Sequence, residues 1–464
     1  MNPQISFLLN KALESLRNSS LNSAELYLKQ AMRLQSNNPH VLRLLGVICA
    51  QRKQYSEALN YLNKSIKHFP KNSLALSNIG NVFLALKEYD NALDAYNKSI
   101  KLDSKYEEAW SNMGNVLYEL KRYEEAIDHY DRAIRLKPDY AEAWSNKGNS
   151  LRALKRYEEA IDHYDRAIGL KPDDADIWAN KGNTLRALKR YDEAIDHYDR
   201  ALSLKPNTAT FFYQKGSINM DFHRYESAIE NLEDAIRNNY QPVSHAKYLL
   251  SALRPQNGLK PMPHDFVADL FNEYADHFDG HLVGALKYNA PEFMFSLLNL
   301  RAGNKFEILD IGCGTGLMGK LLEPFTSRMV GVDLSQDMLS RAESTGVYDE
   351  LLVADVLEFL DECKESFNLV VAADVFIYIG ELKNIFKDLS RIIPAGGLFC
   401  FSIEKSEAAS FSLSPKTLRY SHSREYIQEL ASLNNFKIKN FLEGSIRQEH
   451  EIGVIGICFL LEKF

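Results

Sequence analysis

Hydrophobic and polar positions in the first half of the chain follow a helical spacing that repeats every 34 residues. Glycine returns at that interval from residue 46 to residue 216, and alanine returns at it from residue 24 to residue 228. Small residues at fixed places let the two helices of a hairpin approach closely, and each hairpin buries its apolar face on the next. The pattern predicts a solenoid of about seven helical hairpins with a concave groove.

A different pattern begins near residue 300, where short apolar runs that suit buried strands alternate with helical stretches. The runs occupy residues 308–311, 329–333, 351–355, 367–374, 398–403, 436–442 and 454–461. Alternating strands and helices predict a mostly parallel sheet with right-handed crossovers, and the last two runs predict an antiparallel edge. The predicted fold class is therefore multidomain, with an all-α solenoid followed by an α/β Rossmann-like domain.

The turn after the first of these strands has the chemistry of a nucleotide site. Glycines at 312, 314 and 316 remove the Cβ atoms that keep a ligand off the backbone, and they permit a positive φ. Dinucleotide-binding enzymes also place glycines after a first strand, but two residues separate the second and third glycines of their fingerprint. Only Thr315 separates Gly314 from Gly316, which argues against dinucleotide binding.

Composition excludes several classes of protein. At 464 residues the chain is longer than one core usually covers, so two or more domains are expected. The formal net charge is −7 and no long Lys/Arg run occurs, so no nucleic-acid partner is predicted.

Cysteine usage and the chain's start predict a cytoplasmic protein. The five cysteines are scattered without a Cys-x-x-Cys spacing, as expected for reduced thiols, and no set of residues has convincing metal-ligand spacing. The start has no basic segment before its apolar run, and no run of eighteen apolar residues occurs. Secretion and membrane association by these routes are therefore not predicted.

The letters Asp-x-Gly-x-Gly-x-Gly, with the acid at Asp310, resemble motif I of the class I S-adenosylmethionine-dependent methyltransferases. This resemblance implies S-adenosyl-L-methionine as the cofactor and methyl transfer as the activity. It implies that Asp333 accepts the ribose hydroxyls, that Asp355 takes the adenine amino group and that Val356 offers its backbone N–H to the ring. An alternative for Asp333 is a cap on the following helix. The other residues that the resemblance places around the cofactor are Asp310, Gly312, Cys313, Gly314, Gly316, Leu334, Met338 and Asp374.

The segment before the first strand also carries a resemblance. Its Tyr-Ala-x-x-Phe-Asp core is similar to the cap helix of many small-substrate methyltransferases, and Phe-Asp-x-His-Leu followed by Tyr-x-x-Pro resembles a narrower bacterial group that carries tetratricopeptide repeats. The resemblance implies that Tyr274, Phe278 and Tyr288 shield the cofactor and that His281 lies near the substrate entrance. Alternatively, these aromatic residues are plain core. The expected domains are the repeats at 1–242, a linker at 243–263, cap helices at 264–300 and the methyltransferase domain at 301–464.

The 34-residue units, with Trp110, Trp144 and Trp178 four residues before a glycine, resemble tetratricopeptide repeats. The resemblance implies a protein or peptide partner in the groove, although a spacer or dimerisation element is an alternative. A ladder of asparagines resembles the one by which the repeats of O-linked N-acetylglucosamine transferase hold a peptide backbone. Asparagine is also common at these positions in ordinary repeats. The ladder consists of Asn78, Asn112, Asn146 and Asn180.

The stretch 418–423 also resembles the narrower group, and it places Arg419 and His422 on the substrate side. An imidazole with a pKa of about 6.5 is able to take a proton from an acceptor, so His422 and His281 are candidate general bases, with Arg419 as a further catalytic candidate. Alternatively, Ser423 caps the next helix and His422 is exposed.

These observations predict an S-adenosylmethionine-dependent methyltransferase whose repeats recruit a protein partner or protein substrate. Two alternatives stay open: a small-molecule or glycan methyltransferase that the repeats dock on an assembly, and a cofactor-binding scaffold without catalysis. Asp374-Val-Phe-Ile stands where enzymes that methylate adenine or glutamine amides have Asn/Asp-Pro-Pro-Tyr, which disfavours those acceptors. The acceptor, the partner and the oligomeric state do not follow from the sequence.

Overall fold

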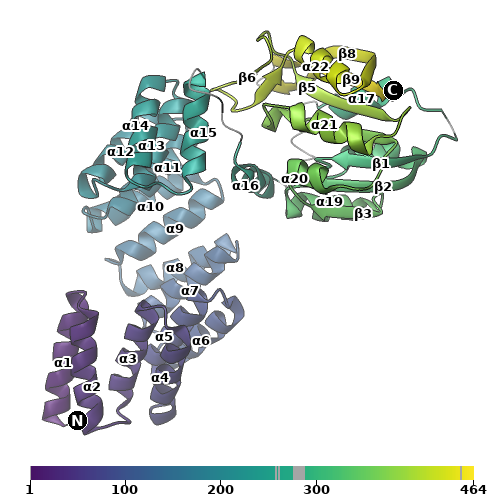
Figure 1. The fold of residues 1–464 in the computed structure, drawn as a ribbon. Coiled ribbons are helices and arrows are strands. Elements are labelled where there is room, and N and C mark those ends of the chain that lie inside the picture. Colours follow the sequence, from purple (N-terminus) through teal and green to yellow (C-terminus); the bar gives the residue numbers. More distant parts are fainter. Residues whose placement is uncertain (1, 256–258, 260–261, 275–287, 302, 450–451) are drawn as a thin grey trace. The chain divides into compact units, whose positions relative to one another are not determined.

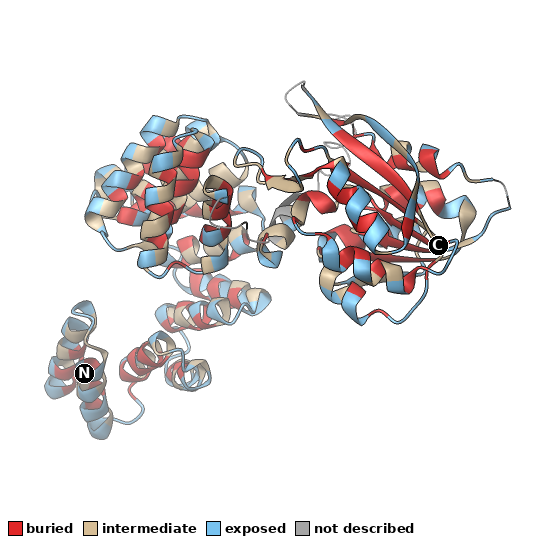
Figure 2. Ribbon diagram, turned by 45° about the horizontal axis from the view of Figure 1, so that its top comes forward, coloured by how far each residue is buried: buried red, intermediate tan, exposed pale blue. Residues whose placement is uncertain are grey.

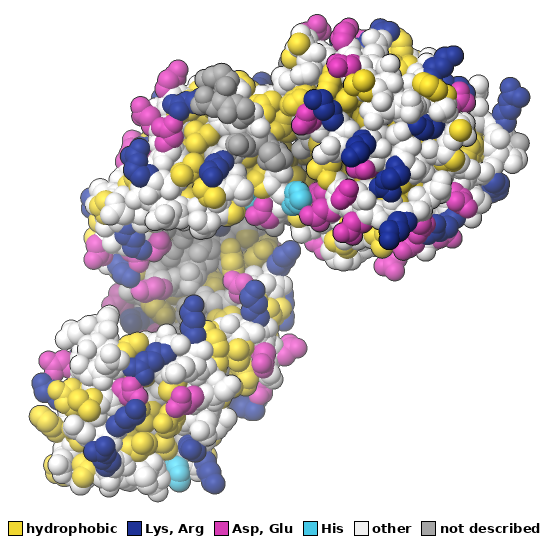
Figure 3. Space-filling view, in the orientation of Figure 1, with side chains coloured by type: hydrophobic (Ala, Val, Ile, Leu, Met, Phe, Trp, Pro, Cys, Tyr) yellow, Lys and Arg dark blue, Asp and Glu magenta, His cyan; other side chains and the backbone are white. Residues whose placement is uncertain are grey.

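The structure is a computed structural model that describes residues 2–255, 259, 262–274, 288–301, 303–449 and 452–464 (Figure 1). It divides into two compact units, Met1–Phe211 and Phe212–Phe464. In the part of the chain described, no helix is both long and apolar enough to cross a membrane. Acidic and basic side chains are mixed over the face seen in Figure 3.

The first unit is a stack of helical hairpins, as the repeat predicts. Its helices are α1 (Pro3–Arg17), α2 (Leu21–Leu34), α3 (Pro39–Gln51), α4 (Tyr55–His68), α5 (Ser73–Ala85), α6 (Tyr89–Leu102), α7 (Glu107–Glu119), α8 (Tyr123–Leu136), α9 (Ala141–Ala153), α10 (Tyr157–Leu170), α11 (Ala175–Ala187) and α12 (Tyr191–Leu204). A seventh hairpin, α13 (Ala209–Asp221) and α14 (Tyr225–Arg237), begins at the boundary and continues into the second unit.

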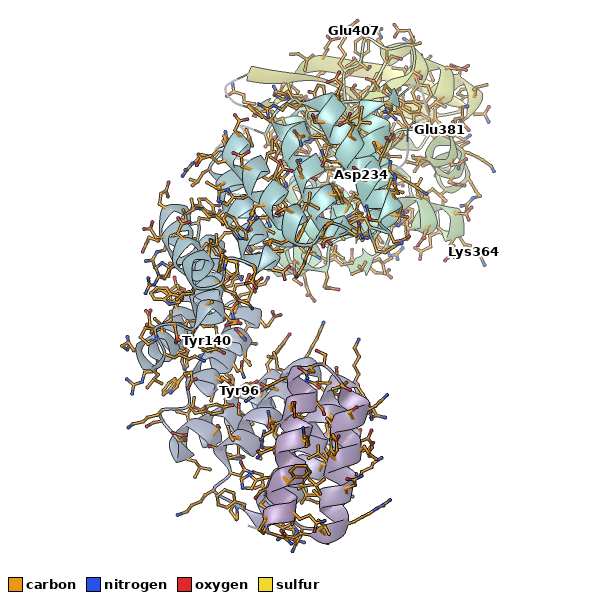
Figure 4. All side chains as sticks on the ribbon, turned by 90° about the vertical axis from the view of Figure 1, so that its left-hand side faces the viewer. Tyr96, Tyr140, Asp234, Lys364, Glu381 and Glu407 are labelled. Atoms are coloured by element: carbon orange, nitrogen blue, oxygen red, sulfur yellow. The ribbon has the colours of Figure 1, made fainter. Side chains whose placement is uncertain are left out.

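Six of the seven hairpins, from α3–α4 to α13–α14, close on a contact between a glycine and a large side chain. A Cβ added at Gly114 on α7 would lie 2.7 Å from the ring of Tyr130 on α8, so only glycine admits that ring. The buried Tyr130 hydroxyl donates to Asn115 Oδ1 over 2.8 Å. The equivalent Tyr96, which is labelled in Figure 4, is also buried and donates to Asn81. The repeated glycine is therefore a packing requirement.

The second unit continues with α15 (Val243–Leu253), α16 (His264–Tyr274) and α17 (Ala290–Leu298). The predicted linker is thus helical from residue 243 to residue 253. Ala246, Leu249 and Ala252 recur on one face of α15 and are buried, and this apolar spacing was not recognised as a helix from the sequence.

A seven-stranded sheet forms the centre of the second unit, in the order β3-β2-β1-β4-β5-β9-β8. The strands are β1 (Phe306–Ile311), β2 (Thr326–Asp333), β3 (Glu350–Val353), β4 (Leu369–Ala372), β5 (Leu398–Glu404), β8 (Phe436–Glu449) and β9 (Ile452–Lys463). The first five run parallel, and β9 is antiparallel to both of its neighbours. A separate two-stranded sheet, β6 (Phe411–Leu413) and β7 (Tyr420–His422), was not predicted.

Helices cover both faces of the large sheet, whose strands are buried along much of their length (Figure 2). One core cluster includes residues of α17 and α18 (Leu317–Leu322), and the other includes residues of α20 (Val356–Glu362), α21 (Lys383–Ile392) and α22 (Arg424–Leu433). The remaining helix of this alternation is α19 (Gln336–Thr345), between β2 and β3. The parallel strands β1 and β4 are neighbours, and the strand order reverses between them. Sheets of this class bind ligands at such a point.

Candidate active site

A cavity opens at the carboxyl ends of the parallel strands, beside the point where the strand order reverses. Most residues that the sequence placed around a cofactor line it, although they come from separate parts of the chain. These are Tyr288, Asp310, Gly312, Cys313, Gly314, Asp333, Leu334, Met338, Asp355, Val356 and Asp374. Gly316 instead caps the start of α18 with a φ of 87°. Phe278, His281 and the side chain of Tyr274 lie outside the described residues.

The glycine turn presents bare backbone to the cavity. Gly314 has a φ of 54°, and a Cβ added to it would meet no atom within 4 Å. Its N–H donates to Asp333 Oδ2 over 2.9 Å, which joins the turn after β1 to the end of β2. A ligand is therefore able to lie directly against the main chain at this point.

Asp310 is buried at the end of β1, paired in register with Gly331 of β2 and Val371 of β4. Burial raises its pKa to about 7, while the hydrogen bond that it accepts from the Tyr348 hydroxyl acts in the opposite direction. Sequence reasoning missed Tyr348. Its ring fills the space that Gly319 and Gly331 leave open, a contact that only the structure shows.

Two further acids that follow strands, Asp333 and Asp355, line the cavity and also bond to nearby groups of the protein. Asp333 accepts the N–H of Ser335 over 2.9 Å, and burial raises the pKa of its carboxyl. The side chain of Ser335, not Asp333, caps α19. Asp355 caps α20, and its Oδ2 lies 3.3 Å from Nε2 of His264, which also lines the cavity.

A cluster of four charged residues borders the cavity beyond β4 and β5. Arg447, from the end of β8, donates to Asp374 Oδ2 over 2.7 Å and to Glu404 Oε1. Arg419 Nη1 lies 3.9 Å from the same Glu404 oxygen. Sequence reasoning identified Asp374 and Arg419 but missed Arg447 and Glu404. Arg447 was missed because β8 extends well beyond the apolar run that predicted it, and Glu404 is the last residue of β5, one position beyond its predicted run.

The prediction that His422 acts as a base is not supported, because His422 does not line the cavity and is fully buried. Its Nε2 lies 2.9 Å from the carbonyl oxygen of Gly380, and burial lowers its pKa to about 4. The alternative of an exposed His422 is also wrong, although Ser423 does cap α22. His422 lies on β7 with its side chain on the buried face, where its ring stacks on that of Tyr426.

The residues of the cavity fit S-adenosylmethionine. Asp333 offers carboxylate oxygens of the kind that bind two neighbouring hydroxyls, and Gly314 leaves room for a ligand against the backbone. Apolar side chains of Leu334, Met338 and Val356 supply surface for an adenine ring. Within the described residues, no group of three or more His, Cys, Asp or Glu side chains is placed to hold a metal ion.

Two of the four asparagines predicted to hold a partner bond to a second asparagine in the preceding repeat. Asn112 Nδ2 donates to Asn81 Oδ1 and Asn146 Nδ2 donates to Asn115 Oδ1, each over 3.0 Å. Asn78 accepts from Arg43 over 3.2 Å, and Asn180 occupies the same place on α11. These bonds use the side-chain nitrogens of Asn112 and Asn146. The side-chain oxygen of each amide is therefore able to accept a further hydrogen bond.

Comparison with known proteins agrees with this architecture. A methyltransferase-domain model matches residues 309–401, and tetratricopeptide-repeat models match residues 80–121, 111–175 and 147–209. The chain therefore carries tetratricopeptide repeats followed by a methyltransferase domain. The resemblance to these two families and the predicted fold class are confirmed.

Curated relatives belong to the S-adenosylmethionine-dependent methyltransferases. A malonyl-[acyl-carrier protein] O-methyltransferase of Salmonella typhimurium is 28% identical over 29% of this chain and 52% of its own length. A probable S-adenosylmethionine-dependent methyltransferase of Saccharomyces cerevisiae is 29% identical over 24% of this chain and 41% of its length. The mitochondrial ubiquinone biosynthesis O-methyltransferase of Homo sapiens is 28% identical over 22% of this chain and 30% of its length. The chain thus spans about half the length of these relatives, or less.

Solved structures match the repeats. A tetratricopeptide repeat protein from Parabacteroides merdae is 21% identical, with a TM-score of 0.42, and the match covers 54% of this chain and 99% of that one. YrrB, described as a tetratricopeptide repeat protein with an unusual peptide-binding site, is 26% identical, with a TM-score of 0.33, over 40% of this chain and 97% of its own.

Proposed function

We propose that the protein transfers a methyl group from S-adenosylmethionine to an acceptor that binds beside β4 and β5, and that its repeats recruit a protein partner or protein substrate. The observation that carries the proposal is the bond between Gly314 and Asp333, which brings a bare turn and a carboxylate suited to bind ribose to one cavity. The methyltransferase-domain match over 309–401 covers both residues.

The donor, when bound, supplies a methyl group on a positively charged sulfur. The work of the chain is then to hold donor and acceptor in line, which alone provides a large part of the rate. Asp333 would hold the ribose, and Val356 would present its backbone N–H to the adenine. Val267 and Phe271 of α16 line the same cavity and would exclude water from it.

The asparagine ladder supports a peptide partner. Since Asn112 and Asn146 are each oriented by a bond to the neighbouring repeat, their free oxygens are held in place to accept backbone N–H groups. The relatives named as O-methyltransferases support the second candidate function, which is methylation of a small or carrier-bound acceptor.

The test is methyl transfer by the full chain from donor labelled in its methyl group to a cell extract. We expect labelled product, and the double variant Asn112→Ala with Asn146→Ala should lower the labelling of protein about fivefold or more, the loss of about one hydrogen bond in binding. Asn97→Ala, on the exposed side of α6, is the matched control. Unchanged labelling of a small molecule by the double variant would favour the second candidate. Donor binding without any product would contradict catalysis.

A further inference from the structure

A stack of three side chains recurs in three consecutive hairpins of the first unit. In the hairpin α7–α8, the ring centres of Trp110 and His129 lie 5.7 Å apart, and the Arg132 guanidinium carbon lies 5.8 Å from the centre of the indole. The indole N–H donates to the carbonyl oxygen of Ser104 over 3.0 Å. The fold thus surrounds the tryptophan with a second ring, a cation and a backbone acceptor.

The next two hairpins, α9–α10 and α11–α12, repeat this arrangement at the 34-residue interval. The ring centres of Trp144 and Trp178 each lie 5.4 Å from that of a histidine. Each indole N–H donates to the carbonyl oxygen of the proline six residues earlier, over 2.9 Å and 3.0 Å. The same position is therefore filled three times by a tryptophan that is held in the same way.

The hairpin α5–α6, which precedes these three, has smaller side chains at the equivalent positions. Leu76 replaces the tryptophan, Ala95 replaces the histidine and Lys98 replaces the arginine. Among the seven repeats, alanine occurs at the histidine position only here, and the others have tyrosine, histidine or asparagine. This hairpin has thus lost both rings of the stack but has kept the positive charge.

A groove lies at the place where the two rings are missing, between α4, α5 and α6 (Figure 1). Its volume is about 710 Å³, within the range of roughly 300–1,000 Å³ that is usual for ligand sites. Leu102 at the groove is 44% exposed, so apolar surface faces the solvent there. The apolar lining includes Ile66, Leu76, Ile79, Phe83, Ala95 and Leu102.

The other groups that hold an indole in the later hairpins have counterparts around this groove. Pro70 lines it and occupies the repeat position whose carbonyl oxygen accepts the indole N–H in those hairpins. Lys98 lines it at the position of Arg132, and its Nζ lies 2.6 Å from a carboxylate oxygen of Asp94. An ammonium, like a guanidinium, is attracted to the face of an aromatic ring. The groove therefore offers an acceptor and a cation to a ring that this hairpin does not supply.

We infer that the groove between α4, α5 and α6 binds the side chain of a tryptophan from a partner protein. The indole takes the place that Trp110 has in the following hairpin, with its N–H on the carbonyl oxygen of Pro70 and its face toward Lys98. Tryptophan is enriched among the residues that anchor protein interfaces. The described lining of the groove contains none of the ladder asparagines, so this is a second site for a partner, and it does not depend on methyl transfer.

Binding of a tryptophan probe to the full chain tests this inference. The probe is fluorinated N-acetyltryptophanamide, followed by fluorine NMR, with S-adenosylhomocysteine present throughout to occupy the donor cavity. We expect one saturable site. The double variant Leu76→Trp with Ala95→His rebuilds the stack from the chain's own residues, so it should melt no lower than wild type and should weaken probe binding about tenfold or more. Equal binding to wild type and the double variant, or no binding to wild type, would overturn the inference.

Single variants test the cation without relying on the double variant. Lys98→Gln should weaken probe binding about threefold. Lys64→Gln is the matched control, since Lys64 has the same place in the preceding hairpin, is exposed and does not line the groove. It should leave binding unchanged, and equal losses in the two variants would contradict the placement of the ring. A wild-type chain that forms a dimer, when the double variant does not, would assign the groove to a second copy of this chain and would overturn the inference.

Discussion

The hydroxyl of Tyr348 donates a hydrogen bond to Asp310 Oδ2 over 2.7 Å at the base of the cavity. Asp310 ends a central strand, and Tyr348 follows α19, so the bond ties the glycine turn to the segment that leads into β3. Because Asp310 is buried, its charge has little access to water. Tyr348 compensates for part of that cost.

The protonation of Asp310 makes the stability of the second unit depend on pH. Burial raises the pKa of Asp310 from 3.8 to about 7 in the folded protein. The folded state therefore binds the proton more tightly than the unfolded state, and the resulting stabilisation is complete below about pH 4 and is lost as the pH rises through 7. Hydrogen exchange of the β1 amides, followed from pH 5 to pH 8, should show stability that falls with pH. Asp310→Asn should remove most of that slope, and a slope equal to wild type would contradict the assignment.

Tyr348→Phe tests the bond itself. The Tyr348 hydroxyl lowers the pKa of Asp310, so its removal should move the pH window upward. It should also destabilise the second unit by about 1 kcal/mol, since a buried acceptor loses its partner. An unchanged window, measured by the same exchange, would mean that the hydroxyl does not control the titration of Asp310.

Two glycines of the repeats should respond oppositely to the same substitution. Gly114→Ala places a Cβ against the ring of the buried Tyr130, and should cost the first unit about 1–3 kcal/mol through overpacking. Gly169→Ala lies within α10 with no atom within 4 Å of the new Cβ, and should stabilise by about 0.5–1 kcal/mol. Thermal unfolding of the two full-length variants measures both changes. Equal effects would contradict the glycine–tyrosine account of the repeat.

Tyr248 is expected to position the loop that carries Arg419, which the sequence places on the substrate side. It is fully buried in α15, and its hydroxyl donates to the carbonyl oxygen of Leu418 over 2.6 Å, one residue before Arg419. Tyr248→Phe should raise the acceptor concentration needed for half-maximal labelling about fivefold, with the maximal rate and the affinity for S-adenosylhomocysteine nearly unchanged. Tyr225→Phe is the control, because the Tyr225 hydroxyl lies 3.2 Å from His223 Nδ1 and is remote in sequence from Arg419. Equal kinetics in the two variants would show that Tyr248 does not hold this loop.

The repeats and the sheet were predictable because each leaves a regular pattern of apolar and small residues in the sequence. Glycine and alanine return every 34 residues, and apolar runs end at Asp333, Asp355 and Asp374, so the solenoid, the parallel strands and most of the cofactor residues could be inferred. The placement of those residues around S-adenosylmethionine stays a prediction.

The acceptor side was not predictable in the same way. Arg447 and Glu404 come from strands far apart in the sequence, and only the order β5-β9-β8 brings their side chains together. His422 looked suited to catalysis because its residue type is, yet its strand position buries it. Neither fact follows from local spacing, since both depend on tertiary packing.

Binding of the donor to the glycine turn is the central claim, and calorimetry with S-adenosylhomocysteine tests it most directly. The full chain should bind it at one site, NAD should not compete, and Gly314→Arg should abolish binding because the side chain would occupy the cavity. Gly346→Arg is the matched control, since Gly346 also has a positive φ and open surroundings but lies at the end of α19, outside the cavity lining. It should keep wild-type affinity. Failure of the wild-type chain to bind, displacement by NAD, or retained affinity in Gly314→Arg would contradict the account.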